Sequence, residues 1–80
     1  AGSDLNEARK FFGQISSKSN LYRQARYLEA ITYYKQAKYK SAKRAFMDVV
    51  RHPLEAKNKA ELAAQKSLVN MALMNIGRMY

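Results

Sequence analysis

Apolar side chains recur along this 80-residue chain every three or four positions, which is the spacing of amphipathic α-helices. From about Asp4 to Ser16 the recurring residues are Leu5, Ala8, Phe11, Phe12 and Ile15. They fall on one face of a helix, so this segment is predicted to be helical, with Ser3 or Asp4 as its N-cap. Residues 16–20, a run of Ser, Lys and Asn, predict a break because Ser and Asn side chains compete for backbone hydrogen bonds.

The next two segments differ in how much of their circumference is apolar. From about Leu21 to Gln36 apolar residues lie nearly all round the predicted helix, which is typical of a helix that packs against several neighbours. From Tyr39 onward a single apolar stripe recurs opposite a basic face. The stripe consists of Tyr39, Ala42, Phe46, Val49 and Val50, and the basic face of Lys40, Lys43, Arg44 and Arg51. This third helix is predicted to end before Pro53, since a residue that precedes proline avoids the helical conformation.

The last segment is predicted to form one long helix from about Leu54 to Tyr80. It is rich in Ala, Leu, Met, Lys and Gln, and Gly77 is its only helix-weakening residue. Its second half carries more apolar side chains than three neighbouring helices of this size are expected to cover. These are Leu68, Val69, Met71, Ala72, Leu73, Met74, Ile76 and Met79.

The chain also repeats itself at an interval of 34 residues, which indicates stacked supersecondary units. This shift aligns Leu5, Ala8, Phe12 and Ile15 with Tyr39, Ala42, Phe46 and Val49. The period and residue types resemble the tetratricopeptide repeat family, whose repeats pair a helix A with a helix B. Ala30 and Tyr33 match the small and aromatic positions of helix A. The helix B positions match at Ala42, Phe46, Val49 and, one residue early, Pro53, and a second helix A matches at Leu73, Ile76, Gly77 and Tyr80.

Three features depart from the family pattern. Arg26 and Glu29 occupy places where helix A carries bulky residues, and the first repeat shows only its helix B. In addition, 47 residues separate Ala30 from Gly77, which is 13 more than one period, and the surplus falls in or beside residues 54–67.

The resemblance implies an all-α fold, a tetratricopeptide-like right-handed stack of four antiparallel helices in the order B, A, B, A. It also implies one domain, residues 1–80, that is a fragment of a longer repeat protein. In this family the A helices line a groove that takes an extended or helical peptide, which implies a non-enzymatic protein-interaction scaffold. The residues that would line the groove here are Gln24, Tyr27, Ile31, Tyr34, Lys35, Met71, Met74, Asn75 and Arg78.

The composition offers little for catalysis or for binding a metal or cofactor. There is one histidine, no cysteine and no phosphate-binding glycine loop, and the six carboxylates are spaced without pairing. His52, at a helix end, is expected to cap the helix or face solvent, and Asp48 and Glu55 are interpreted as surface charges. We therefore expect no enzyme activity, no cofactor and no metal. No apolar run approaches the roughly 20 residues that span a bilayer, so no membrane span is expected.

Charge bears on the choice of partner. A net charge of +9, from 15 Lys and Arg against 6 Asp and Glu, attracts acidic proteins, nucleic acids or anionic surfaces without choosing among them. We expect a protein or peptide partner with acidic and apolar residues. A basic nucleic-acid-binding helical domain is the alternative, because cations interleave with six tyrosines. The tyrosines, however, fall at repeat-signature positions or on the crowded second helix, where a packing role is favoured. Self-association through the C-terminal helix is also expected, because its apolar face lacks a polar cover.

Overall fold

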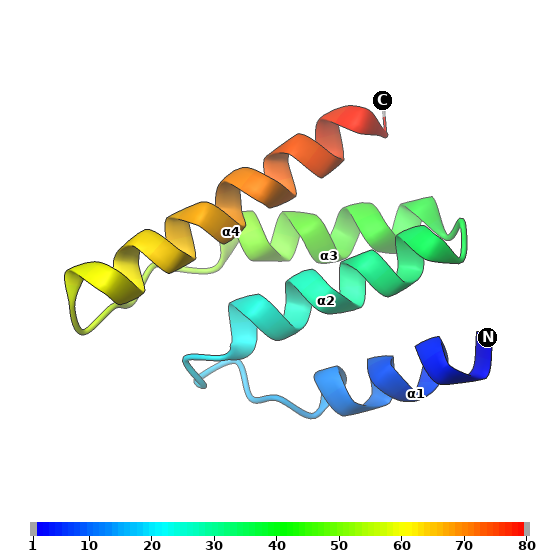
Figure 1. Cartoon of the computed structure of the whole chain (residues 1–80), viewed down its shortest axis with the longest axis horizontal. Helices are drawn as coiled ribbons and strands as arrows, with labels where there is room; N and C mark the ends of the chain where they lie inside the picture. The colour runs from blue at the N-terminus through cyan, green and yellow to red at the C-terminus, as the bar shows by residue number, and fades with distance from the viewer. Residues whose placement is uncertain (1, 80) are drawn as a thin grey trace.

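The computed structural model describes residues 2–79, which form four α-helices and no strand, as the all-α prediction requires. The helices are α1 (Gly2–Gly13), α2 (Tyr22–Lys35), α3 (Tyr39–Arg51) and α4 (Lys59–Arg78). Helix α2 lies at the centre and packs against the other three, while α4 packs against α3 and, less extensively, against α2 (Figure 1). The prediction that the second helix has several neighbours is therefore confirmed.

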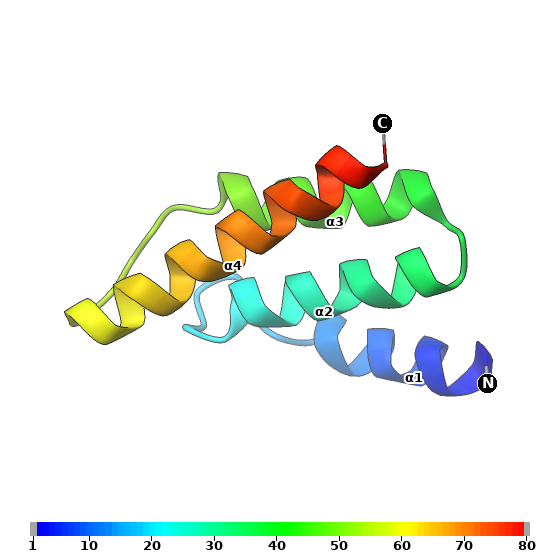
Figure 2. The ribbon, with the colours of Figure 1, turned by 45° about the horizontal axis from the view of Figure 1, so that its top comes forward.

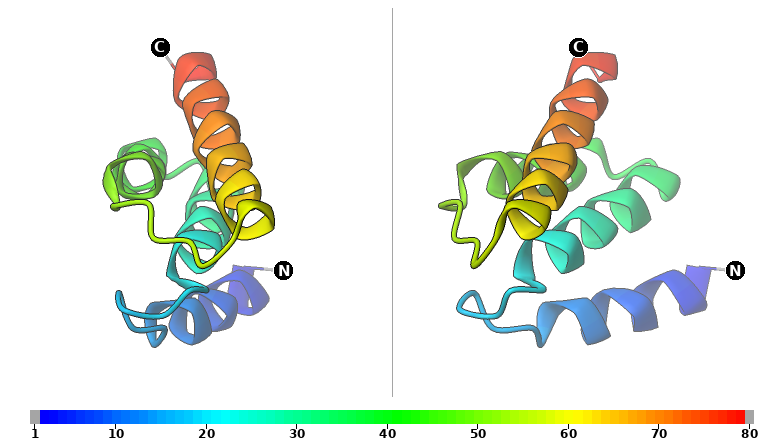
Figure 3. Two further views of the ribbon diagram at one scale, coloured as in Figure 1. Left: turned by 90° about the vertical axis from the view of Figure 1, so that its left-hand side faces the viewer. Right: turned by 60° about the vertical axis from the view of Figure 1, so that its left-hand side comes forward.

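Consecutive helices run in opposite directions, so α2 and α4 run the same way (Figure 1, Figure 2). Seen from the end, α1 lies at the bottom and α4 reaches the top, with α2 and α3 between them (Figure 3). Arg9 ties α1 to α2: its Nη1 donates to Gln36 Oε1 at 2.6 Å, and its guanidinium lies 4.4 Å from the ring centre of Tyr33.

The core lies between α2, α3 and α4, and small residues allow these helices to approach closely. Its buried members are Ala30, Ala42, Ala45, Phe46, Val49, Ala72 and Ile76. Phe46 and Val49 are its largest fully buried side chains, and the ring of Tyr27 packs edge-on against Phe46 at 5.6 Å between centres. The predicted stripe of the third helix is thus buried at Ala42, Phe46 and Val49, while Val50 is partly buried against the core and Tyr39, which begins α3, is 50% exposed.

The first helix ends earlier than its apolar pattern predicts. It ends at Gly13 rather than Ser16, because the amides of Gln14 and Ile15 bond to carbonyls only three residues back, which tightens the chain into turns. The helix also begins at Gly2, so Ser3 and Asp4 lie inside it rather than at its N-cap.

The α2–α3 turn closes as a Schellman motif. The amide of Lys38 donates to the carbonyl of Tyr33 at 2.9 Å, and the amide of Ala37 to that of Tyr34 at 3.0 Å. This motif requires a left-handed residue after the helix, and Ala37 supplies it with φ of 58°. Glycine usually takes this position because it has no Cβ to crowd the backbone.

The prediction of one helix from Leu54 to Tyr80 is wrong at its start, because residues 54–58 are not helical. Helix α4 begins at Lys59, where Asn58 is the N-cap and its side chain accepts from the Glu61 amide at 2.8 Å. Glu61 in turn accepts from the Lys57 amide at 2.9 Å. An asparagine followed three residues later by glutamate is a start signal that the apolar pattern concealed.

The apolar second half of α4 is covered only in part. Ile76 is buried and Met79 packs against the core, whereas Met71, Leu73 and Met74 are exposed by 38%, 49% and 60%. Gly77 does not serve close helix packing, because a Cβ added there would meet no atom within 4 Å.

Candidate functional site

The nine predicted groove residues lie on two helices that contact each other, five on α2 and four on α4. Asn75 joins the two sets: its Nδ2 donates to Tyr27 Oη at 3.2 Å and to the carbonyl of Met71 at 2.9 Å. The structure therefore brings together Tyr27 of α2 and the Met71–Asn75 turn of α4. Lys35 lies eight residues beyond Tyr27, roughly 12 Å along the axis of α2, and so extends past this contact.

The predicted residues differ in how much they expose. Six are exposed, namely Gln24, Tyr34, Lys35, Met71, Met74 and Arg78, and the other three, Tyr27, Ile31 and Asn75, are half-buried. Tyr27 and Ile31 also pack against the core, so they support the fold as well as the surface. Asn75 is held in place by its two hydrogen bonds.

One exposed residue of this surface was missed from the sequence. Leu28, 37% exposed, stands on α2 between Gln24 and Ile31 at intervals of four and three residues, and this spacing was the available signal. We call the resulting surface the α2–α4 face. It consists of Gln24, Tyr27, Leu28, Ile31, Tyr34, Lys35, Met71, Met74, Asn75 and Arg78.

Two polar networks, neither of them predicted, position α2 against α3. In the first, Arg23 is only 4% exposed, and its guanidinium donates to backbone carbonyls at the C-terminal end of α3. The acceptors are the carbonyls of Val49, of His52 at 2.7 Å and of Pro53 at 2.9 Å. Burial lowers the pKa of Arg23, because the charged form loses solvation.

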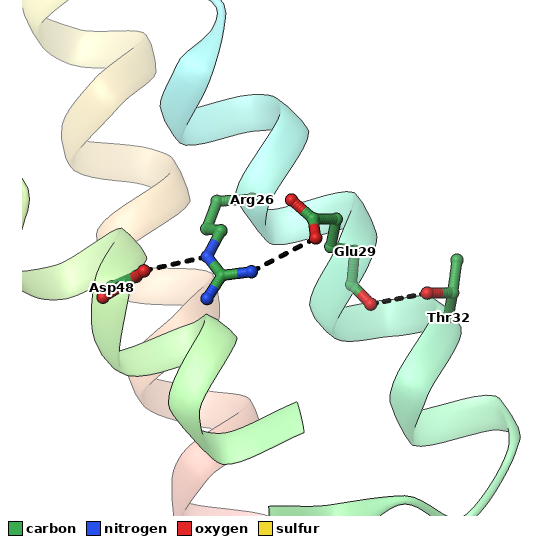
Figure 4. A network of polar contacts seen from close by, with 4 residues as sticks. All are labelled: Arg26, Glu29, Thr32 and Asp48. Carbon is green, nitrogen blue, oxygen red and sulfur yellow. Dashed lines mark hydrogen bonds and ion pairs between the residues drawn. The ribbon is translucent and has the colours of Figure 1, made fainter. Parts of the chain in front are cut away.

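In the second network, Arg26 bridges two acidic side chains (Figure 4). Its Nε donates to Asp48 Oδ2 at 2.9 Å across to α3, and its Nη1 donates to Glu29 Oε2 at 3.2 Å. Burial tends to lower the pKa of Arg26, but the hydrogen bond to Asp48 and the charges of Asp48 and Glu29 outweigh it and raise the pKa. The Oγ1 of Thr32 donates to the carbonyl of Glu29 at 2.6 Å.

This network accounts for Arg26 and Glu29, the two polar residues that stand where the resemblance implies bulky ones. Glu29 is only 8% exposed, and the positive charge of Arg26 on the same helix compensates its negative charge. The Arg26–Glu29 ion pair therefore takes the place of apolar packing at these two positions. The interpretation of Asp48 as a surface charge is accordingly wrong in part, since it binds Arg26 across the helix interface. His52 is the C-cap of α3, and its ring packs against that of Tyr22 at 4.6 Å between centres.

Two hollows open away from the α2–α4 face. One, about 510 Å³ in volume, lies between the α1–α2 and α3–α4 connections and includes Arg23 and Gln65 in its lining. The other, about 380 Å³, lies beside α3 and is lined by Arg26, Lys43, Arg44, Met47, Asp48 and Arg51.

Some chemistry has no residues to support it in the described part of the chain. Residues 2–79 contain no group of three or more His, Cys, Asp or Glu side chains placed to hold a metal ion. Among the helices described, none combines the length and apolarity needed to cross a membrane. Comparison of the chain with protein-family models, curated proteins and solved structures gave no significant match.

Proposed function

We propose that this chain is a non-enzymatic interaction module that binds a segment of a partner protein on the α2–α4 face. The observation that carries the proposal is the concentration of exposed apolar side chains there. Leu28, Tyr34, Met71 and Met74 are between 37% and 60% exposed on two helices that are joined by the Tyr27–Asn75 hydrogen bond. A cluster of apolar side chains left open on a surface is typical of an interaction site.

The helix order also supports a tetratricopeptide-like stack, which we propose together with the function. The α2–α3 hairpin carries the repeat's small and bulky residues in the core, through Ala30, Ala42 and Phe46. Helix α4 follows α3 in the direction of α2, as a second helix A does (Figure 1). In such a stack the surface shared by α2 and α4 is the lining of the groove.

The partner segment is expected to combine apolar and acidic residues. Tyrosine and methionine offer large contact area, and methionine adapts to different shapes, so these side chains suit an apolar anchor. Lys35 and Arg78, both exposed, stand at the same end of the two helices, where they would attract acidic residues and add a salt-dependent association rate.

The test uses two neighbouring residues of α4. Met74 is 60% exposed on the α2–α4 face, while Leu73 is 49% exposed on the opposite flank of α4 from Met71. The wild-type chain, Met74→Asp and Leu73→Asp are used to capture proteins from the source cells. The captured partner is then purified and titrated against each chain by calorimetry.

Met74→Asp is expected to weaken binding by about tenfold or more, because it removes an apolar contact and repels acidic residues. Leu73→Asp should change affinity by less than about twofold, since it adds the same charge on the other flank. Circular dichroism melting confirms that both variants fold. Equal weakening by the two substitutions, or no saturable partner, would exclude the α2–α4 face.

A further inference from the structure

A second surface, on the outer side of α3, carries charge that the proposed function does not use. Lys40, Arg44 and Arg51 are exposed, and within residues 2–79 their side chains form no hydrogen bond or ion pair. With Met47 they follow one another at intervals of four, three and four residues. This spacing places them in one row about 16 Å long on a single side of the helix. We call Lys40, Arg44, Met47 and Arg51 the α3 row.

Within residues 2–79, no acidic side chain pairs with the cations of the row. The only carboxylate between Gln36 and Arg51 is Asp48, and its Oδ2 already accepts from Arg26 Nε at 2.9 Å. The hollow of about 380 Å³ beside α3 is lined by four cationic side chains and this one carboxylate, and two of the cations, Arg44 and Arg51, belong to the α3 row. Met47 supplies its apolar part between Arg44 and Arg51.

An exposed aromatic ring stands beside the N-terminal end of the row, about 100° round α3 from Lys40. Tyr39 is 50% exposed and directly precedes Lys40. Its ring meets that of Tyr34 edge-on at 5.5 Å between centres, with an interplanar angle of 69°, which fixes its orientation. The exposed Lys38, in the adjoining turn, extends the positive charge around it.

The geometry points to this surface as a binding site for single-stranded nucleic acid, with the phosphodiester backbone along the α3 row and a base on Tyr39. A strand carries one negative charge per nucleotide and can bend to follow a row of cations. Guanidinium groups match phosphate oxygens in a two-pronged geometry. Aromatic stacking beside a track of cations is the common way in which proteins hold single strands without reading their sequence.

An acidic protein segment would also be attracted to these cations, but it offers no flat base to stack on Tyr39. The cations of the α3 row can be changed separately from the α2–α4 face, which lies on α2 and α4, although Tyr39 contacts Tyr34 of that face. Failure of either proposal leaves the other standing.

The experiment measures fluorescence anisotropy of a labelled deoxythymidine strand of about 15 nucleotides over a range of salt concentrations. The double variant Arg44→Gln/Arg51→Gln is compared with Lys10→Gln/Lys18→Gln, which makes the same change in net charge at exposed positions before α2. Three phosphate contacts predict a log–log salt slope of about −2, since each contributes about 0.7 on a single strand.

The arginine double variant is expected to bind about tenfold more weakly at low salt and to lose about 1.4 from the magnitude of the slope. The lysine double variant should keep the slope. Equal losses in both variants would overturn the proposal, because they would show a diffuse charge effect. Circular dichroism confirms that each variant is folded.

Tyr39→Leu separates a nucleic-acid site from a generic anion site, because leucine keeps apolar contact with Tyr34 but offers no flat ring. It should weaken binding of the deoxythymidine strand several-fold without changing the salt slope. Binding of polyglutamate should not change. If polyglutamate binds as tightly as the strand, and Tyr39→Leu affects neither, the surface is for acidic proteins and the proposal fails.

Discussion

Arg23 of α2 holds the end of α3 through His52: its Nη2 donates to the His52 carbonyl at 2.7 Å. The last carbonyls of a helix have no partner within the helix, and they lie at the negative end of its dipole. The buried guanidinium of Arg23 donates hydrogen bonds to these carbonyls, and its positive charge interacts favourably with the negative end of the dipole. Arg23 thereby fixes where α3 ends and the α3–α4 connection begins.

Replacing Arg23 with Met should lower the free energy of unfolding by about 2 to 4 kcal/mol, because buried carbonyls lose charge-assisted hydrogen bonds. Lysine should not restore it, since a single ammonium group cannot reach the carbonyls of Val49, His52 and Pro53 together. Urea unfolding monitored by circular dichroism measures the change. Full stability of Arg23→Lys would show that charge alone, rather than the fork of donors, caps α3.

Phe46 fills the centre of the core and is fully buried. Phe46→Ala should cost on the order of 3 to 5 kcal/mol, which is most of the stability of a domain this small. Arg44→Ala, on the exposed side of the same helix, should cost less than about 0.5 kcal/mol. Thermal melting of the two variants compares them, and similar melting temperatures would mean that the α3 stripe does not carry the core.

Ala37 occupies a left-handed conformation that disfavours side chains with a Cβ. Ala37→Gly is therefore expected to stabilise the protein by about 1 kcal/mol, after allowing for the greater freedom of glycine in the unfolded chain. Ala56→Gly, in the α3–α4 connection, is the matched control and should be neutral or destabilising, because Ala56 has no positive φ to relieve. Equilibrium urea unfolding gives both values, and a loss of stability in Ala37→Gly would contradict the assignment of strain.

Burial, together with the nearby charge of Asp48, raises the pKa of Tyr22 above its ordinary value of 10.0. The folded protein therefore keeps the phenolic proton to higher pH than the unfolded chain does. This contribution to stability is complete below about pH 10 and is lost as the pH rises from there through the folded-state pKa. Tyr22→Phe cannot ionise, so its stability should fall less than that of the wild type between about pH 9 and pH 11. Urea titrations across this range test the prediction, and parallel pH profiles would refute it.

The local pattern of the chain was enough to predict helices and the faces they bury. The single stripe of α3 predicted Phe46 and Val49 in the core, and the nearly all-round apolarity of α2 predicted its several neighbours. These predictions succeed because side-chain spacing along a helix translates directly into direction. The residues of the α2–α4 face, apart from Leu28, were named from the resemblance to a repeat family rather than from helical spacing alone.

Only the tertiary structure decided which polar groups meet. Arg26 and Glu29 read as departures from a repeat pattern until Asp48, 22 residues away from Arg26, came within 2.9 Å. Arg23 gave no local sign that it caps another helix. The start of α4 at Lys59, by contrast, is set locally by the Asn58 cap on the Glu61 amide, a signal that the apolar pattern concealed. A charged side chain or a helix-end carbonyl is stabilised by a hydrogen-bond partner at about 3 Å. Residues distant in sequence reach that distance only when the helices pack.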